Sequence, residues 1–300
     1  MAGTNIDKDA SETAGHGRRS VFTKVGTGAV GAVALGALAA GGLVGTTVPA
    51  AAQSVTDADI LNFALNLEYI EAEYYLRAFT GAGLAAGDIS GTGTVGNVTG
   101  GTQVPFRSSA IQAYAQRLTV DEQTHVRFLR AALGSAAVAR PAINFTDTFN
   151  ALAVGAGLIV QGQSFNPFAD DVSFLLGAFV FEDVGVTAYA GAARLITSKD
   201  FLEAAAGILA VEAYHAGSIR TLLANIGAGD AVNKIANFRG SLGGGKEQGL
   251  TITGLNYNAV AADSQSLAFR RTTSEVLNIV YAGNSAGGGF TPSRFNGTIR

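Results

Sequence analysis

Apolar residues recur every three or four positions in four long segments of the chain, which is the spacing of one buried face of an α-helix. Thr56 before an acidic first turn is typical of a helix start, and Gly134 and Gly227 are typical of helix ends. The pattern therefore predicts an all-α protein. We expect its long helices over residues 56–79, 108–133, 169–196 and 199–226.

The segments between these helices differ greatly in length. Residues 80–105 are rich in Gly and Thr and residues 135–168 contain two prolines, so we expect loops in both places. Only a short turn separates the third and fourth helices. Two helices, a long crossover and two more helices predict a four-helix bundle over residues 53–226. Residues 227–300 are Gly-rich, and we expect a C-terminal extension that is mostly irregular, with a short helix over 274–281.

The first 52 residues have the order of an export signal. Arg18 and Arg19 precede a weakly apolar stretch over 25–48, and small residues follow at 50–52. Paired arginines favour the twin-arginine (Tat) pathway, and a core of Gly and Ala is poorly suited to remain in a membrane. We expect a cleaved Tat signal at 1–52, a mature protein in the periplasm, cell envelope or extracellular space, and no stable membrane span. An uncleaved anchor is the alternative.

Composition narrows the chemistry that the chain can perform. The absence of Cys excludes thiol catalysis, Cys-bound zinc and iron–sulfur clusters, and the absence of Met beyond position 1 excludes a Met-ligated haem. A net charge of −3, with only 14% charged residues, gives no support for a nucleic-acid partner. Of the three histidines, His16 lies in the expected signal, so imidazole chemistry depends on His125 and His215.

Both remaining histidines lie in the same short motif. Glu122 and His125 form Glu-x-x-His in the second predicted helix, and Glu212 and His215 form it in the fourth. Three residues are about one helical turn, so the carboxylate and the imidazole share a face and can reach one metal ion. A single motif of this kind is usually a solvated pair, but its duplication and its apolar neighbours favour a buried site.

The first and third predicted helices repeat a second motif. Glu68 is followed seven residues later by Tyr75, and Glu182 is followed seven residues later by Tyr189. Seven residues are nearly two turns, which places each Tyr on the face of its Glu. The chain thus contains Glu-x6-Tyr and then Glu-x-x-His, twice over, as expected of an internal duplication.

The four glutamates of these motifs would repel one another in a bundle core unless cations neutralise them. Two divalent metal ions would balance their charge. The alternative is a polar network around Arg130 and Arg220, each of which lies five residues after a motif histidine. Two more acids follow Glu68 in the first helix: Glu71 is a candidate extra ligand or entry-site acid, whereas we expect Glu73 to be exposed.

With these motifs the chain resembles the ferritin-like superfamily, and most closely its exported desiccation- and stress-related branch. The resemblance rests on both Glu-x-x-His motifs and on residues 65–75 and 276–283, and it extends over nearly all of residues 55–290. It implies a ferritin-like bundle that binds two Fe or Mn ions. By this resemblance the terminal ligands are Glu68 and Glu182, the bridging ligands are Glu122 and Glu212, and His125 and His215 bind one ion each.

The resemblance also implies roles for the two tyrosines and for the protein. Tyr75 and Tyr189 would be catalytic-site phenols that hydrogen-bond ligand carboxylates, with core packing as the alternative. The protein would react with O₂, peroxide or Fe²⁺ in stress protection, as a ferroxidase, peroxidase, catalase or oxygenase. A non-catalytic protective or cell-envelope protein that keeps the fold is the alternative. The long C-terminal segment argues against a storage cage but leaves a homo-oligomer open.

Overall fold

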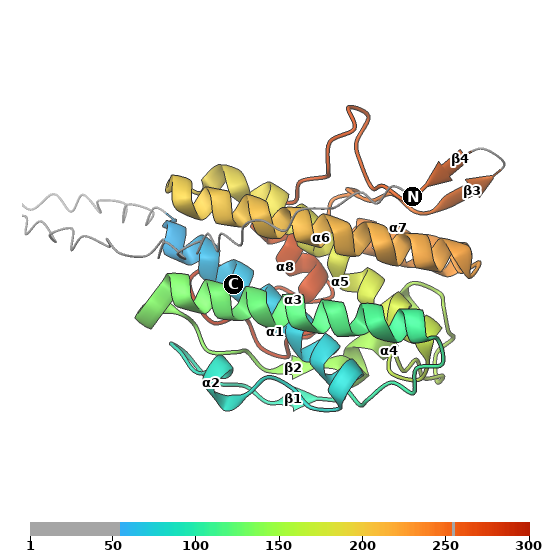
Figure 1. Ribbon diagram of the computed structural model, residues 1–300, viewed down its shortest axis with the longest axis horizontal. Helices are drawn as coiled ribbons and strands as arrows, with labels where there is room; N and C mark the ends of the chain where they lie inside the picture. The colour runs from blue at the N-terminus through green and yellow to red at the C-terminus, as the bar shows by residue number, and fades with distance from the viewer. Residues whose placement is uncertain (1–54, 254–255) are drawn as a thin grey trace, which may run out of the picture. The chain divides into compact units, whose positions relative to one another are not determined.

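The computed structural model describes residues 55–300 except 254–255, so the expected export signal at 1–52 lies outside the described residues (Figure 1). The described chain contains the predicted all-α bundle. α1 packs along α3, α5 packs along α6, and a long crossover joins α3 to α5. The bounds of these helices are α1 Asp57–Thr80, α3 Ser109–Leu133, α5 Asp171–Ala192 and α6 Lys199–Asn225.

The ends of α1 follow from local chemistry. The Thr56 hydroxyl accepts a hydrogen bond from the Asp59 N–H, and the Asp59 carboxylate accepts one from the Thr56 N–H at 2.9 Å, which forms a capping box. At the other end, Gly81 has φ of 81° and its N–H donates to the Arg77 carbonyl. A residue with a side chain would be strained in that left-handed conformation, so the glycine ends the helix.

The two predicted loops contain short elements that pack along the side of α1 and α3 (Figure 1). The first contains α2 (Ala86–Ile89) and β1 (Val98–Thr99), and the second contains η1 (Gly134–Ala136), β2 (Ile143–Asn144) and α4 (Phe145–Gly155). β1 and β2 pair in parallel, with Val98 opposite Ile143. The rings of Phe145 and Phe149 on α4 lie 5.8 Å from the ring of Tyr74 on α1, so α4 caps the aromatic end of the core.

α5 is the central helix of the core. Together with its continuation η2 (Ala193–Leu195), it is the one helix among the described residues that is long and apolar enough to cross a membrane. Of its most apolar stretch, 89% is buried inside the protein. The low polarity of α5 is therefore explained by its packing against α1, α6, α7 and α8.

The expectation of irregular structure after residue 226 is wrong for α7 (Gly229–Leu242), which follows α6 almost without a break (Figure 1). α7 packs on α5, and its buried positions have the spacing of one helical face: Val232, Ile235, Ala236, Arg239 and Gly240. The Gly- and Asn-rich composition concealed this spacing.

The rest of the C-terminal segment also belongs to the compact unit formed by residues 53–300. β3 (Thr251–Thr253) and β4 (Asn256–Asn258) form a small antiparallel hairpin. α8 (Thr273–Val280) begins with a capping box between Thr272 and Glu275 and packs on α5 and α7. α8 lies where the short helix was expected.

Candidate metal centre

The bundle core contains a cluster of six buried glutamate and histidine side chains, drawn from four helices. α1 and α5 contribute one glutamate each, and α3 and α6 contribute one Glu-x-x-His pair each. Measured over whole residues, no member of the cluster is more than 8% exposed. The structure therefore brings together all six residues that the sequence singled out: Glu68, Glu122, His125, Glu182, Glu212 and His215.

The donor atoms of the cluster form two overlapping groups. Glu68 and His125 belong only to the first group, and Glu182 and His215 belong only to the second. Glu122 and Glu212 belong to both, and within each group the donor atoms lie within 4.8 Å of one another. Two adjacent sites that share two carboxylates are the arrangement expected for a pair of bridged metal ions.

Several of these donor atoms are buried without a hydrogen-bond partner. Nδ1 of His215 lies 3.1 Å from Oε1 of Glu122 and 3.3 Å from Oε2 of Glu182, yet it is hydrogen-bonded to neither. Buried polar atoms are rarely left unsatisfied, and six in one place call for a ligand. The six are Glu68 Oε2, Glu122 Oε1, Glu182 Oε2, both carboxylate oxygens of Glu212, and His215 Nδ1.

Two tyrosines fix the outer oxygens of the glutamates on α1 and α5. The Tyr75 hydroxyl on α1 donates to Oε1 of Glu182 on α5, and the Tyr189 hydroxyl on α5 donates to Oε1 of Glu68 on α1. Each tyrosine thus donates a hydrogen bond to the glutamate of the other repeat. Both are buried positioning residues that leave Oε2 of each glutamate free for a metal ion.

A glycine on α5 makes room for one shared carboxylate. A Cβ atom at Gly185 would lie 2.2 Å from Oε2 of Glu212. The buried Glu212 side chain would have to shift to accommodate a methyl group there. Glycine at position 185 therefore leaves room for this carboxylate, which the sequence motifs do not reveal.

Burial and neighbouring charges set the protonation of the cluster when no metal ion is bound. Burial raises the pKa of Glu68 to about 7, and burial together with repulsion from Glu122 raises the pKa of Glu212 well above its usual range. Burial alone would lower the pKa of His215, but the carboxylates of Glu182 and Glu122 raise it to about 12. Protons therefore occupy the cluster and must leave when a metal binds.

The ring of His215 has a second carboxylate partner that the sequence analysis missed. Nε2 of His215 lies 3.0 Å from Oδ2 of Asp121, and the Arg117 guanidinium donates two hydrogen bonds to the same Asp121 carboxylate. A metal-binding imidazole is commonly held in this way through its other nitrogen. In the sequence, Asp121 is the acid directly before Glu122. The equivalent residue before Glu212 is Val211, so Asp121 is not part of the repeated motif and was not recognised as a partner of His215.

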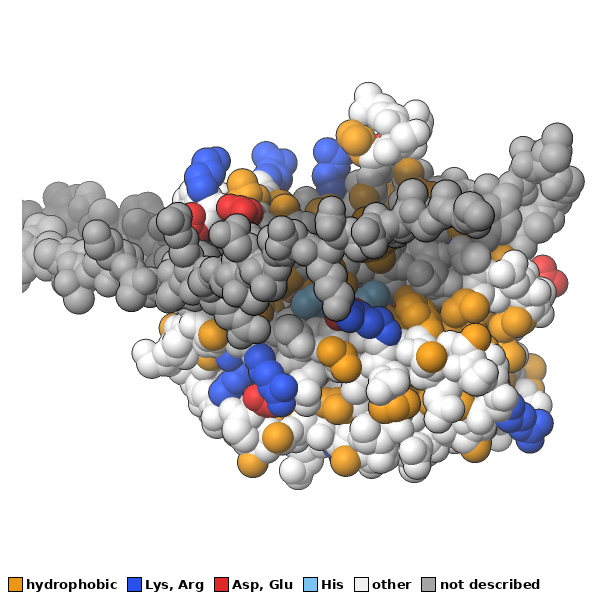
Figure 2. Space-filling model, in the orientation of Figure 1, with side chains coloured by type: hydrophobic (Ala, Val, Ile, Leu, Met, Phe, Trp, Pro, Cys, Tyr) orange, Lys and Arg blue, Asp and Glu red, His pale blue; other side chains and the backbone are white. Residues whose placement is uncertain are grey.

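The cluster approaches the surface on the side of α3 and α6. The side chains of His125 and His215 are 10% and 5% exposed, and the Asp121 side chain beside them is 11% exposed. Figure 2 shows pale-blue histidine atoms at the surface, with Lys or Arg atoms next to them. This edge of the cluster is therefore polar and close to solvent.

The arginines proposed as an alternative to metal do not pair with the cluster. Arg130 donates to the Tyr69 hydroxyl and to backbone carbonyls, and Arg220 donates to Asp183 at 2.9 Å. Tyr69 and Asp183 directly follow the glutamates of α1 and α5, so the two arginines make equivalent contacts in the two repeats. Among the described residues, neither has a hydrogen bond or ion pair with the six cluster side chains.

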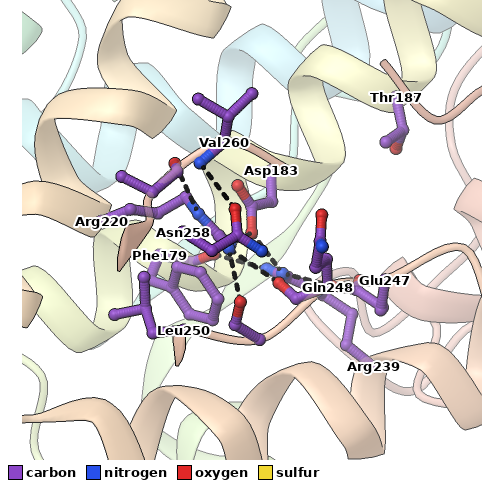
Figure 3. A network of polar contacts seen from close by, with 12 residues as sticks. Phe179, Asp183, Thr187, Arg220, Arg239, Glu247, Gln248, Leu250, Asn258 and Val260 are labelled. Carbon is purple, nitrogen blue, oxygen red and sulfur yellow. Dashed lines mark hydrogen bonds and ion pairs between the residues drawn. The ribbon is translucent and has the colours of Figure 1, made fainter. Parts of the chain in front are cut away.

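Asp183 is also the centre of a buried ionic network that holds the C-terminal segment on the bundle (Figure 3). It accepts hydrogen bonds from Arg220 on α6 and from Arg239 on α7, and Arg239 also pairs with Glu247. The guanidinium carbons of both arginines lie over the ring of Phe179, at 5.6 and 4.5 Å from its centroid.

The two additional acids of α1 have different environments. Glu71 is buried next to the cluster and has no hydrogen bond or ion pair among the described residues, but it belongs to neither donor group. The expectation that Glu73 is exposed is wrong, because Glu73 is fully buried and pairs with Arg77, at 2.9 Å, and with Arg140. Arg140 comes from the crossover, and nothing near Glu73 in the sequence indicated it.

Comparisons with known proteins agree with this geometry. A family model described as the ferritin-like domain matches residues 56–225, which contain every helix that contributes to the cluster. A desiccation-related protein from Craterostigma plantagineum is 31% identical over 249 residues, which are 74% of this chain and 76% of that protein. A ferritin-like catalase from Nesocodon mauritianus is 28% identical over 271 residues, which are 81% of this chain and 84% of that protein.

Proposed function

Because the chain belongs to the ferritin-like domain family, we propose that it binds two divalent Fe or Mn ions in the cluster and uses them for redox chemistry in stress protection. The observation that carries this proposal is the convergence of six glutamate and histidine side chains in two overlapping donor groups, with six of their buried polar atoms left without a hydrogen-bond partner. Carboxylate and imidazole ligands suit iron or manganese, and the cluster has no thiolate that would favour a softer metal.

Charge supports two ions rather than one. Four buried carboxylates carry a charge of −4, and two divalent ions with neutral imidazoles balance it. Glu68 and Glu182 would each bind one ion, with their outer oxygens held by the tyrosines, and Glu122 and Glu212 would bridge the ions. When bound, such an ion pair supplies two electrons to a reaction, whereas the chain orients the ligands and shields them from water.

Peroxide is the substrate that the comparisons favour. The relative from Nesocodon mauritianus is named a ferritin-like catalase, and two peroxide molecules give two waters and one O₂ in that reaction. Peroxide is polar, and the α3/α6 edge of the cluster is polar and close to solvent. We therefore place peroxide first among the candidate substrates, with O₂ and Fe²⁺ as further reactants of the same site, and we propose that the protein acts after export through the Tat pathway.

Metal analysis of the mature, untagged protein tests this proposal directly. We expect about two Fe or Mn ions per chain and metal-dependent turnover of peroxide. Glu122→Ala and His215→Ala should abolish both, because each removes a ligand. Glu203→Ala and Tyr214→Ala, which change exposed residues on α6, should change neither. Wild-type protein that stays metal-free with every ligand intact would contradict the proposal.

The ion pairs within the cluster support a second candidate function that does not need a metal. Each histidine lies within 3.5 Å of at least two glutamates, so protonated imidazoles would also compensate part of the buried charge. A non-catalytic protective or cell-envelope protein would then need the fold but not the metal. In that case the ligand variants would protect cells from drying or oxidants as well as the wild type does.

A further inference from the structure

Two small apolar cavities lie next to each other beside α5 and α8. The outer cavity measures about 30 Å³ and lies between α4, α5, α7 and α8. Half-buried side chains such as Leu152, Phe165 and Phe238 line it, so it adjoins the surface. The inner cavity measures about 20 Å³ and lies between α1, α5 and α8, and every residue that lines it is buried.

The two cavities share one wall, and the inner one extends to a residue next to the cluster. Val180 of α5 and Ile279 of α8 line both cavities, so these two side chains separate them. Glu71 and Gly185 are among the residues that line the inner cavity. A Cβ atom at Gly185 would lie 2.2 Å from Oε2 of Glu212, so Gly185 borders both the inner cavity and one of the shared carboxylates, although none of the six cluster side chains lines this cavity.

We propose that the two cavities form a passage for O₂ between the α4/α7 surface and the metal centre. A cavity needs about 10–15 Å³ to hold a water-sized molecule, so both cavities admit a diatomic molecule and neither admits an organic substrate. The direction of transport depends on the reaction, because O₂ leaves if the centre disproportionates peroxide and enters if the centre consumes O₂. The inference rests on the proposed function.

The polarity of the lining favours O₂ over peroxide or water in this passage. The one polar side chain of the outer cavity, Arg239, already donates to Asp183, Glu247 and the Phe179 carbonyl. In the inner cavity the one polar side chain is Glu71, at the end next to the cluster. Water and peroxide need several polar partners when buried, whereas an apolar cavity binds apolar molecules. Polar reactants would instead use the α3/α6 edge.

Substitutions at the shared wall test the passage. Val180→Phe on α5 and Ile279→Phe on α8 should block the opening between the two cavities, and Val180→Ala should widen that opening. Val172→Phe is the matched control, because Val172 is 42% exposed on the same helix. In the metal-loaded, chemically reduced protein, either Phe variant at the wall should slow reoxidation by O₂ about tenfold, equivalent to about 1.4 kcal/mol of added barrier, and leave reoxidation by peroxide unchanged.

Xenon binding separates this inference from the proposed function. Xenon should occupy both cavities of the wild type and of Val180→Ala and lose the inner position in the two Phe variants, whatever the metal does. Circular dichroism and metal content identify a variant that has merely lost its fold or its site. Xenon absent from both cavities, or equal O₂ rates in folded, metal-loaded wild-type and Phe variants, would overturn the passage. A wild type that reacts with neither oxidant contradicts the proposed function, while xenon still tests the passage.

Discussion

His125 and His215 occupy equivalent positions in the two repeats, but their rings are held differently. Nε2 of His215 faces the Asp121 carboxylate, which Arg117 holds in turn. At the position equivalent to Asp121 the second repeat has Val211, and Nε2 of His125 has no hydrogen bond among the described residues. The two metal positions are therefore expected to differ in affinity, with the tighter one at His215.

Asp121→Ala tests this difference at the scale of one residue. Loss of the carboxylate frees the His215 ring to rotate and lowers its basicity, so one of the two binding steps should weaken about 10–100-fold while the other stays unchanged. Stepwise titration with Mn²⁺, followed by calorimetry, measures both steps. Thr124→Ala, an exposed change on the same helix, is the control. Equal weakening of both steps would contradict the assignment.

The cluster residues were predictable from the sequence because they are repeated at fixed spacing. Glu68, Glu182 and the two Glu-x-x-His pairs needed only helical geometry to be recognised. The residues around them depend on contacts between distant segments, which spacing does not encode. Asp121 meets His215 across the bundle, and Arg140 meets Glu73 from the crossover, 67 residues away. The partners that surround the ligands were therefore found only in the structure.

At the scale of elements, α7 shows why composition misled the prediction of the C-terminal segment. Its buried face places an arginine among apolar residues, and Arg239 is stabilised because Asp183 and two backbone carbonyls of α5, together with Glu247, accept its hydrogen bonds. The four bundle helices, by contrast, contain long apolar segments that are recognisable from the sequence, and α5 is buried on nearly every side. A helix whose burial depends on an ion pair with another element is harder to recognise from the pattern of apolar residues.

Asp183→Ala tests how strongly this network holds α7 and the C-terminal segment on the bundle. The change leaves Arg220 and Arg239 buried without a shared carboxylate, so the free energy of unfolding should fall by about 3–5 kcal/mol. Urea unfolding of the metal-free protein measures the effect without a contribution from metal binding. Asp230→Ala, an exposed change on α7, should cost far less. Similar losses in the two variants would show that the network is not stabilising.

At the scale of the whole molecule, the cluster links stability to pH. The pKa of Glu68 is raised from 4.5 to about 7 and that of His215 from 6.5 to about 12 in the folded protein without metal. A raised pKa contributes stability that is fully present below the unfolded value and is lost as pH rises through the folded value. For Glu68 this loss falls between about pH 4.5 and about pH 7.

The metal-free protein should therefore melt at a lower temperature as the pH rises from about 5 to about 8. Metal binding displaces the protons, so the stabilisation by added Mn²⁺ should grow over the same range. Thermal unfolding with a chelator and with Mn²⁺ measures both effects. In the metal-free protein, Glu68→Gln should make the melting temperature depend less on pH. Metal-free stability that rises with pH, with the same slope in Glu68→Gln, would refute this linkage.

The crossed tyrosine bonds have a consequence for how such a site arises. Tyr75 in the first half serves Glu182 in the second, and Tyr189 in the second half serves Glu68 in the first. A helical hairpin with one Glu-x6-Tyr and one Glu-x-x-His motif would therefore gain every one of these contacts by pairing with a copy of itself. Two identical hairpins would suffice to build the six-ligand cluster, whereas the contact of Asp121 with His215 requires the two halves to differ, because Val211 occupies the equivalent position.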